Sequence, residues 1–300
     1  MDKINLFREL RIFNVPFYRN WDVKRHSNFK IGGKIAALIE IHKLNQIIDA
    51  IRILNSCGKK YFVIGNLTNV LVRDGKPDIV FISLKGDFEK IAGNSKNLIF
   101  AGAGVQNDRL LDYMIKNDIG GLEFLSGIPG TIGGAIYMNA GAYGKYIGNF
   151  IKNILVVDRK GQFKILNNKK IFSYRNSIFQ KDGSAILGAT IKVFPKDGRK
   201  TLKEMKQILK IRHAKHPWNA ACAGSFFKNT KKFSAGMLIE NAGLKGFSVG
   251  DATVSEMHAN FIINKGKATF DDVMRLAKIV KNKVYKKFKI KLKEEVIIIK

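Results

Sequence analysis

The chain contains little cysteine, proline or tryptophan. Its 300 residues include two cysteines, five prolines and two tryptophans. Two cysteines, Cys57 and Cys222, are too few for a disulfide framework or a zinc site, and we expect both to be buried free thiols. No low-complexity run is present, and the hydrophobic content of 46% is typical of a folded protein. This length predicts two or three domains.

Long apolar runs are also absent. No stretch approaches the roughly 18 apolar residues that a membrane span needs. The first residues, MDKINLFRELRIF, carry charges among their apolar positions, unlike the core of a signal peptide. We therefore expect a cytoplasmic protein with no membrane partner.

Acidic residues are scarce: 24 Asp and Glu face 53 Lys and Arg, so the net charge is +29. Such a charge fits a nucleic-acid or membrane-surface partner, or a polyanionic small ligand. It also fits a lysine-rich composition without a specific purpose. The lysines are spread along the chain and gather only modestly in KNKVYKKFKIKLK near the C-terminus. We favour the second interpretation and expect no specific nucleic-acid partner, since no recognisable binding module is present.

Hydrophobic periodicity predicts mixed helices and strands. Apolar spacing favours helices over 45–56, 107–116, 202–215 and 234–241, and a capping box at Thr269–Asp272 opens another. Alternating or apolar runs predict strands over 61–64, 79–84, 98–101, 154–157, 163–166, 185–194, 258–264 and 290–299. Strict β-α-β alternation is missing, which indicates an α+β fold. No Gly-x-Gly-x-x-Gly opens a helix after the first strand, so a Rossmann site is not supported. Pro195–Gly198 is the best linker candidate.

The stretch over residues 121–144, GLEFLSGIPGTIGGAIYMNAGAYG, has the most informative composition. It has seven glycines and one proline and is almost uncharged. The part over residues 127–134 predicts a tight loop that runs into a short helix. Glycine allows backbone N–H groups to approach a ligand, and a helix start offers unpaired N–H donors to an anion such as a pyrophosphate. A packed turn would have the same composition.

The residue sequence of this stretch resembles that of one protein family. GIPGTIGG followed by MNAGAYG is similar to the loop of the UDP-N-acetylenolpyruvoylglucosamine reductases, the MurB flavoenzymes of peptidoglycan synthesis. Further similar motifs follow in the family's order from His26 to Val296: YRNS at 174–177, AGSFFKN at 223–229, LIENAGLKG at 238–246, HANFIIN at 258–264 and LKEEV at 292–296. The chain lacks a long insertion between YRNS and AGSFFKN, so it resembles the shorter, type II form.

The resemblance implies a fold and a cofactor. It implies an FAD-binding fold of the vanillyl-alcohol-oxidase (PCMH) type in two subdomains, residues 1–84 and 85–197, and a C-terminal α+β substrate domain, residues 198–300. FAD is then bound noncovalently. The FAD-binding residues that it implies are Gly65, Asn66, Thr68, Asn69, Gly104, Ser126, Gly127, Ile128, Pro129, Gly130, Gly133 and Gly134.

The turn Gly65–Asn69 departs from the family's Gly-x-Gly-Ser-Asn. Thr68 replaces the serine, and Leu67 stands where the second glycine is expected. Leucine is strained at positive φ. Either the turn has changed shape, with Asn66 in the left-handed position, or the glycine is not essential.

The resemblance also implies the catalytic residues. Ser225 would protonate the substrate carbon, although a lone serine among small residues is more often structural. Arg175 would bind a carboxylate through its planar fork. Alternation places both Glu294 and Glu295 among apolar residues and does not choose between them, whereas the family pattern Leu-x-x-Glu-Val selects Glu295, whose pKa desolvation would raise. The implied substrate-binding residues are Asn139, Tyr143, Tyr174, Lys228 and Asn229.

The implied activity is that of an FAD-dependent UDP-N-acetylmuramate dehydrogenase. NADPH reduces FAD, flavin N5 delivers hydride to the enolpyruvyl ether of UDP-N-acetylglucosamine, and UDP-N-acetylmuramate results. We expect a monomer with no metal. An oxygen-using oxidase of the same fold would share the flavin loops but not YRNS, AGSFFKN and LKEEV together. A basic nucleic-acid-binding protein would explain the charge but none of these motifs.

Overall fold

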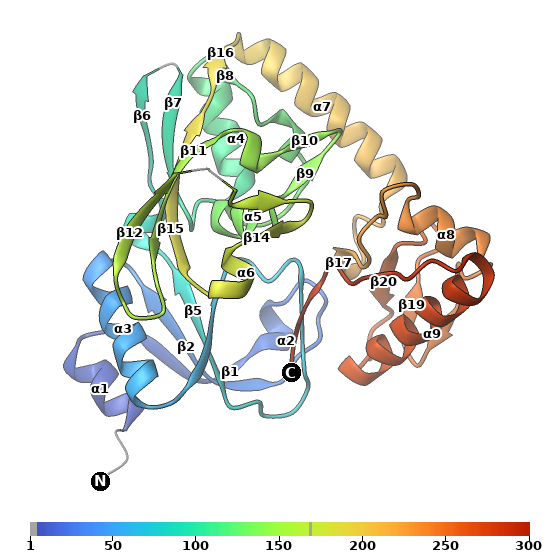
Figure 1. Cartoon of the computed structure of the whole chain (residues 1–300), viewed down its shortest axis with the longest axis horizontal. Coiled ribbons are helices and arrows are strands. Elements are labelled where there is room, and N and C mark those ends of the chain that lie inside the picture. The colour runs from blue at the N-terminus through green and yellow to red at the C-terminus, as the bar shows by residue number, and fades with distance from the viewer. Residues whose placement is uncertain (1–4, 96, 168–169) are drawn as a thin grey trace. The chain divides into compact units, whose positions relative to one another are not determined.

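The structure is a computed structural model that describes residues 5–95, 97–167 and 170–300 (Figure 1). The chain forms two compact units, each made of separate stretches. The first unit comprises Met1–Arg19, Ala36–Asn66 and Asp78–Lys210; the second comprises Asn20–Ile35, Leu67–Pro77 and Ile211–Lys300. The division into residues 1–84, 85–197 and 198–300 stays a prediction.

A sheet with a parallel centre forms the N-terminal part of the fold. Its strand order is β1 (Phe17–Asp22), β2 (Lys34–Ile41), β5 (Ile79–Leu84) and β3 (Lys60–Ile64), and β2, β5 and β3 run parallel. Five of the six residues of β5 are buried, as expected for a parallel strand covered on both faces. The predicted helix between β2 and β3 is confirmed as α3 (Leu44–Ser56), and α1 (Leu6–Ile12) packs against it.

The rest of the first unit is built on a five-stranded antiparallel sheet. Its order is β12 (Phe163–Asn167), β11 (Ile151–Val157), β15 (Ala185–Lys192), β7 (Leu98–Gly102) and β6 (Ile91–Ser95). The short helix α5 (Ile132–Met138) packs against β15 and β7, and one continuous apolar core includes residues of both sheets, α5 and α4 (Asn107–Lys116). This packing gives the glycine-rich loop before α5 a rigid base.

Short elements complete the first unit. They are η1 (Gly86–Glu89), β8 (Ile119–Gly120), η2 (Glu123–Leu125), β9 (Gly141–Ala142), β10 (Lys145–Tyr146), η3 (Ile147–Asn149), β13 (Phe172–Ser173), β14 (Asn176–Ser177), α6 (Phe179–Asp182) and β16 (Phe194–Pro195).

The second unit has its own sheet and core. The antiparallel order is β17 (Ala221–Ser225), β20 (Phe261–Asn264), β19 (Ala252–Val254) and β18 (Ser248–Val249), with α8 (Ala235–Asn241) and α9 (Phe270–Phe288). The predicted capping box and the predicted apolar face of α9 are confirmed. Two stretches from early in the chain belong here: α2 (Val23–His26) and β4 (Val70–Val72), which pairs in parallel with β21 (Ile297–Ile299).

Several local predictions are wrong. Pro195 is not in a linker, because β16 pairs with β8, and Gly198 begins α7 (Gly198–Lys215). A Cβ on Gly198 would collide with the Ile115 carbonyl oxygen, so this helix start is packed closely on the end of α4. The last strand covers only Ile297–Ile299 of the predicted 290–299, and β20 starts at Phe261. Cys222 is buried as expected, whereas Cys57 is partly exposed. Among the described residues, no helix combines the length and apolar character needed to cross a membrane.

Candidate active site

The turn after β3 keeps the shape that a glycine would give it. Leu67 has φ +50°, and Asn66 is not among the residues with positive φ, so the alternative of a left-handed Asn66 is wrong. The Leu67 side chain is buried, with 4% of its surface exposed. Leu67 therefore bears the strain of the left-handed conformation, which costs about 1–2 kcal/mol for a residue with a Cβ.

The two glycine-containing segments predicted to bind FAD meet in the first unit. A Cβ on Gly65 would lie only 2.6 Å from Thr131 Oγ1, so the start of the turn touches the residue that caps α5. Gly127 and Gly130 have φ of +71° and +133°, values that side chains disfavour. A Cβ on Gly133 would lie 2.9 Å from Ala103 Cβ, and a Cβ on Gly104 would lie 2.5 Å from the Leu84 carbonyl oxygen. These glycines are required by local geometry.

The start of α5 does not offer the unpaired donors that the sequence suggested. The N–H groups of Ile132 and Gly133 donate to the carbonyl oxygens of Val105 and Ala103 at 2.8 and 2.9 Å. The Gly134 N–H donates to Thr131 Oγ1 at 3.3 Å, and the Ala135 N–H to the Thr131 carbonyl at 2.8 Å. That expectation is wrong, because the helix start is bonded to its own scaffold. A phosphate would have to be held by the loops around it.

Two buried polar atoms beside this loop fit a bound ligand. Ser126 Oγ and Asn107 Oδ1 are buried and have no hydrogen-bond partner among the described residues. Asn107 Nδ2 donates to the Ile128 carbonyl at 2.9 Å, which ties that side chain to the loop. Buried polar groups are rarely left unbonded, so the two atoms favour a polar ligand such as a dinucleotide at this loop. Asn107 was not predicted, since a helix-starting asparagine carries no distinct sequence signal.

Arg175 is held in a strained backbone conformation, with φ +50°. Its Nη2 donates to the Gly141 carbonyl at 2.8 Å, and its guanidinium lies 5.3 Å from the centre of the Tyr174 ring. Left-handed residues other than glycine cluster at functional sites, where surrounding structure maintains the strain. The guanidinium is thus held by the glycine-rich segment itself, next to the predicted substrate residue Tyr174, which is 41% exposed.

Asn139 and Tyr143 differ in what they can do. Asn139 ends α5 in the left-handed region, and its amide accepts from the Gly148 N–H at 3.0 Å and donates to the Ser173 carbonyl at 2.9 Å. Asn139 therefore positions the segment before Tyr174. Tyr143 also has positive φ, +52°, and is 54% exposed, so its ring can reach a ligand.

Ser225 lies at the end of β17, after a β-bulge. Cys222 pairs with Ile263 and Ser225 pairs with Phe261, so β17 uses one residue more than β20 between these pairs. Gly224 has φ +74° at the bulge. A bulge turns the following side chains away from the regular alternation and is common near active sites. The bulge sets the direction of Ser225.

The backbone connects Ser225 with Glu295 through a single residue. The Glu295 N–H donates to the Phe226 carbonyl at 2.8 Å, and Phe226 directly follows Ser225. The amide of Asn69, a predicted FAD ligand, donates to the Glu295 carbonyl at 3.3 Å. The second unit thus brings Asn69, Ser225 and Glu295 together.

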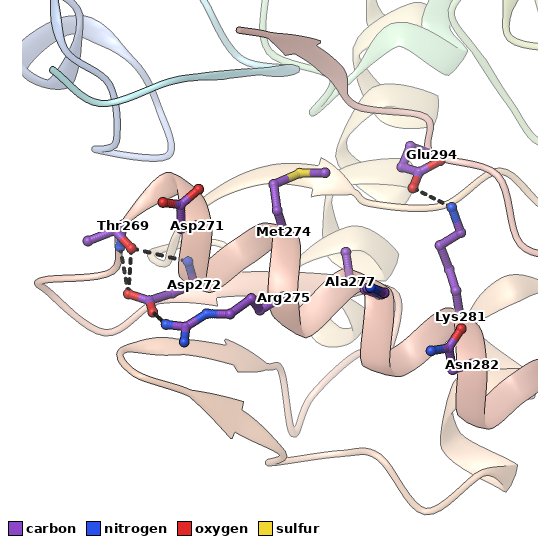
Figure 2. A pocket seen from close by; sticks show the side chains of 10 residues that line it. Thr269, Asp271, Asp272, Met274, Arg275, Ala277, Lys281, Asn282 and Glu294 are labelled. Atoms are coloured by element: carbon purple, nitrogen blue, oxygen red, sulfur yellow. Dashed lines mark hydrogen bonds and ion pairs between the residues drawn. The ribbon is translucent and has the colours of Figure 1, made fainter.

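The structure gives one of the two glutamates that alternation left open an ion pair, and the predicted role of Glu295 stays a prediction. Glu294 Oε1 lies 2.8 Å from Lys281 Nζ in an ion pair (Figure 2). The pair lies in an open groove of about 970 Å³ along α9, which contains none of the predicted site residues. Its lining consists of Thr269, Asp271, Asp272, Met274, Arg275, Ala277, Lys278, Lys281, Asn282 and Glu294.

Lys228 and Asn229 continue from Ser225. The Lys228 N–H donates to the Lys293 carbonyl at 2.8 Å, which holds this segment beside the C-terminal one. Asn229 Oδ1 accepts from the Ala235 N–H at 2.8 Å at the start of α8. The side-chain oxygen of Asn229 thus has a structural partner, so in the predicted role its side-chain nitrogen would contact the substrate.

Two segments of the chain match known protein-family models. Residues 35–167 match the model of the FAD binding domain, and residues 216–299 match that of the UDP-N-acetylenolpyruvoylglucosamine reductase C-terminal domain. The chain is 38% identical over 297 residues to the UDP-N-acetylenolpyruvoylglucosamine reductase of Clostridium tetani, covering 98% of this chain and 95% of that protein. It is 36% identical over 278 residues to the same reductase of Alkaliphilus oremlandii, covering 92% and 91%.

Solved structures with a similar fold agree with these family matches. The crystal structure of UDP-N-acetylenolpyruvylglucosamine reductase from Thermus caldophilus matches with a TM-score of 0.80 and 28% identity, covering 95% of this chain and 99% of that chain. A berberine bridge enzyme variant matches with a TM-score of 0.52 and 14% identity, covering 65% of this chain and 44% of that one. The latter similarity shows only the fold, and the predicted α+β fold of the PCMH type is confirmed.

Proposed function

Because the chain belongs to the UDP-N-acetylenolpyruvoylglucosamine reductase family, we propose that it converts UDP-N-acetylglucosamine enolpyruvate to UDP-N-acetylmuramate in peptidoglycan precursor synthesis. The protein is an FAD-dependent oxidoreductase, and NADPH is the reductant. The connection of Ser225 to Glu295 through Phe226 is the observation that supports this reaction best, because a backbone hydrogen bond holds the segments of the two predicted donors side by side.

FAD fits the residues of the glycine-rich segments. When bound, FAD supplies hydride transfer from NADPH to the methylene carbon of the enolpyruvyl group. The loop over residues 126–130 would hold it through the buried Ser126 hydroxyl and through backbone groups that glycine leaves accessible. The turn over residues 65–69 would hold its pyrophosphate through Thr68, Asn69 and the backbone.

Arg175 and Glu295 stabilise the charge that develops on the substrate. Addition of hydride to the methylene carbon leaves an electron pair on the neighbouring carbon, delocalised into the carboxylate. The planar fork of Arg175 can bind both carboxylate oxygens, and a carboxyl group at Glu295, if protonated, can donate to the same enolate-like system. The hydrogen bond from Arg175 to Gly141 restrains the guanidinium before substrate enters.

Ser225 completes the reaction by protonating the carbon that carries the electron pair. The bulge at Gly224 and the hydrogen bonds of Phe226 hold the backbone on both sides of Ser225, from which its hydroxyl projects. Lys228 and Asn229 follow within four residues, and we assign them to the UDP portion of the substrate, where a cation and an amide suit a diphosphate. A flavin oxidase of the same fold would not need this combination of Ser225, Arg175 and Glu295.

The half-reactions can be separated by anaerobic absorption spectroscopy. The flavin band of the purified protein should bleach when NADPH is added and return when the UDP-linked enolpyruvyl ether is added without oxygen. A band that returns only on admission of air would instead identify an oxidase. A protein that neither contains nor binds FAD would contradict the proposed function altogether.

The Ser225→Ala variant tests the proton donor. Flavin reduction by NADPH should keep its normal rate, because that step needs no proton from Ser225. Anaerobic reoxidation by the enolpyruvyl ether should slow by about 10²–10⁴-fold, the usual contribution of a positioned acid. Stopped-flow absorbance measures both steps. Normal reoxidation in this variant would remove Ser225 from the mechanism.

The cytoplasmic location, the monomeric state and the lack of a specific nucleic-acid partner stay predictions. They accord with a soluble sugar-nucleotide substrate and a small-molecule reductant. Sedimentation of the purified protein tests the monomeric state directly.

A further inference from the structure

We propose that Asn260 is a positioning residue for proton transfer: its buried side chain fixes the backbone that follows Ser225 and thereby the direction of the Ser225 hydroxyl. The inference rests on the proposed role of Ser225. Asn260 lies immediately before β20 and is 3% exposed. It belongs to the HANFIIN stretch, for which the sequence indicated no role beyond a structural histidine.

Asn260 binds the main chain on both residues that follow Ser225. Its carbonyl oxygen accepts from the Phe226 N–H at 2.7 Å. Its side-chain oxygen accepts from the Phe227 N–H at 3.0 Å, and its side-chain nitrogen donates to the Phe227 carbonyl at 2.8 Å. The side-chain amide thus acts as one further peptide group of the β17–β20 ladder, beyond the last strand pair at Ser225.

This anchor is needed because the ladder is irregular at Ser225. The bulge removes the regular register between Cys222 and Ser225, and Gly224, with φ +74°, is flexible by nature. A Cβ on Gly224 would meet no atom within 4 Å, so side-chain packing does not restrain the backbone there. Restraint must come from the other side of Ser225, where Asn260 supplies it.

Asn260 is itself held by His258. The Asn260 N–H donates to His258 Nδ1 at 3.1 Å. Nδ1 can accept only in the neutral imidazole with its proton on Nε2, and burial lowers the pKa of His258, which favours that form. His258 also packs against Phe261, the cross-strand partner of Ser225, with 4.9 Å between ring centres.

The same anchor reaches the second predicted catalytic residue of this unit. Phe226 donates its N–H to Asn260 and accepts the Glu295 N–H on its carbonyl oxygen at 2.8 Å. Movement of Phe226 would therefore shift Ser225 and Glu295 together. Geometry errors of about 1 Å can cost about 10²-fold in rate even when binding is retained.

The test compares two buried asparagines at opposite ends of β20. Asn264 is 8% exposed, donates to the Phe29 carbonyl at 3.2 Å and accepts the N–H groups of Gly266 and Ala268 at 2.8 and 3.0 Å. Its loss should destabilise the same unit without touching the segment after Ser225. Asn264→Ala is therefore the matched control for Asn260→Ala, with both holoenzymes compared at equal flavin content.

In Asn260→Ala we expect anaerobic reoxidation by the enolpyruvyl ether to slow about 10–100-fold. The half-saturating ether concentration and the rate of flavin reduction by NADPH should change less than about threefold. Asn264→Ala should reoxidise at the normal rate. Equal reoxidation rates in the two variants would overturn the proposal. If Asn260→Ala does not fold, Asn260→Asp keeps the shape and the acceptor for Phe227 but loses the donor, and it should show the same selective loss.

Combination with Ser225→Ala distinguishes the possible failures. Because Asn260 acts on Ser225 and, through Phe226, on Glu295, Asn260→Ala should slow reoxidation less in the Ser225→Ala protein than in the natural protein. Only the part of the loss that is due to Glu295 should remain. Multiplied losses would show an independent effect and overturn the positioning role. Normal reoxidation in Ser225→Ala would overturn the mechanism on which the inference rests. Slow Ser225→Ala together with normal Asn260→Ala would overturn the positioning role alone.

Discussion

At the scale of single residues, the site is marked by backbone conformations that side chains disfavour. Leu67, Asn139, Tyr143 and Arg175 have φ between +46° and +52°, and each belongs to a segment predicted to bind FAD or substrate. Asparagine tolerates this region, whereas leucine and tyrosine do not. Such strain persists only where the surrounding structure enforces it, which the hydrogen bonds of Asn139 and Arg175 illustrate.

Leu67 offers a direct test of that strain. Glycine and alanine both remove the buried side chain, so both variants should be less stable than the natural protein. Glycine also relieves the left-handed strain, so Leu67→Gly should be about 1 kcal/mol more stable than Leu67→Ala. Denaturant unfolding of the two variants measures the difference.

The informative result is which of these two variants is more stable, because a glycine normally makes a protein less stable than an alanine at the same position. A more stable Leu67→Ala would contradict a left-handed Leu67. FAD affinity, followed by flavin fluorescence, should change less than about threefold in Leu67→Gly, because the turn already has the conformation that glycine adopts.

At the scale of elements, an ion-pair network ties the start of α7 to η2. Lys196 Nζ lies 2.7 Å from Glu123 Oε1 and 2.6 Å from Glu204 Oε2. Only 1% of the Glu123 side chain is exposed. Burial by itself would raise the pKa of Glu123, but hydrogen bonds from Lys196 and from the Gly121 N–H lower it overall. This network explains why the residues around Pro195 are ordered structure rather than a linker.

Removal of the lysine should be costly. Lys196→Met keeps most of the side-chain volume but leaves Glu123 buried without its cation, so we expect a loss of about 3–5 kcal/mol at pH 7. In the natural protein, the lowered pKa of Glu123 stabilises the fold at pH values above the pKa that glutamate has in the unfolded chain. This stabilisation is lost as the pH falls through the lower pKa of Glu123 in the folded protein. In the variant, Glu123 protonates more readily, so the difference between the two proteins should shrink below about pH 4.5.

Urea unfolding at pH 7 and near pH 4 measures this difference. Lys200→Met, on the exposed side of α7, is the control and should be almost neutral. A Lys196→Met protein as stable as the control at pH 7 would contradict the network.

At the scale of the whole molecule, neither unit is one continuous stretch of chain. The second unit takes Asn20–Ile35 and Leu67–Pro77 from the N-terminal third. These stretches contribute β4, which pairs with β21, and Asp74, whose Oδ2 accepts the Phe270 N–H at 2.7 Å at the start of α9. Phe29, Ile31 and Leu71 enter its apolar core. The net charge of +29 is shared between both units and provides no boundary between them.

A fragment of residues 211–300 should therefore not fold alone. It lacks β4, the buried Phe29 and Ile31, and the acceptor for Asn264 Nδ2 at the Phe29 carbonyl. Loss of several buried side chains, each contributing about 1.5–3 kcal/mol, exceeds the stability of a domain of this size. Circular dichroism and amide dispersion in an NMR spectrum test this expectation, with the intact chain as the control. A cooperative thermal transition in the fragment would contradict it.

The sequence by itself determined the elements and the family. Periodicity located α3, α4, α8, α9 and the central strands, because each has one apolar face that must be buried. Motifs carried the family and the cofactor, because backbone contact with a ligand restricts residue choice to glycine and small side chains at fixed spacing. The prediction of a linker at Pro195 was wrong, because this segment is ordered by pairing with β8, which lies far away in sequence.

Only the tertiary structure decided matters that depend on contacts between distant segments. Alternation could not show that Glu294 forms an ion pair with Lys281 or that the Glu295 N–H donates to the Phe226 carbonyl, and the role of Glu295 stays a prediction. The sequence could not show that the N–H groups at the start of α5 are already bonded, that Leu67 is left-handed, or that Asn260 holds the backbone beside Ser225. Each of these depends on where a distant backbone group lies, and local sequence does not encode that position.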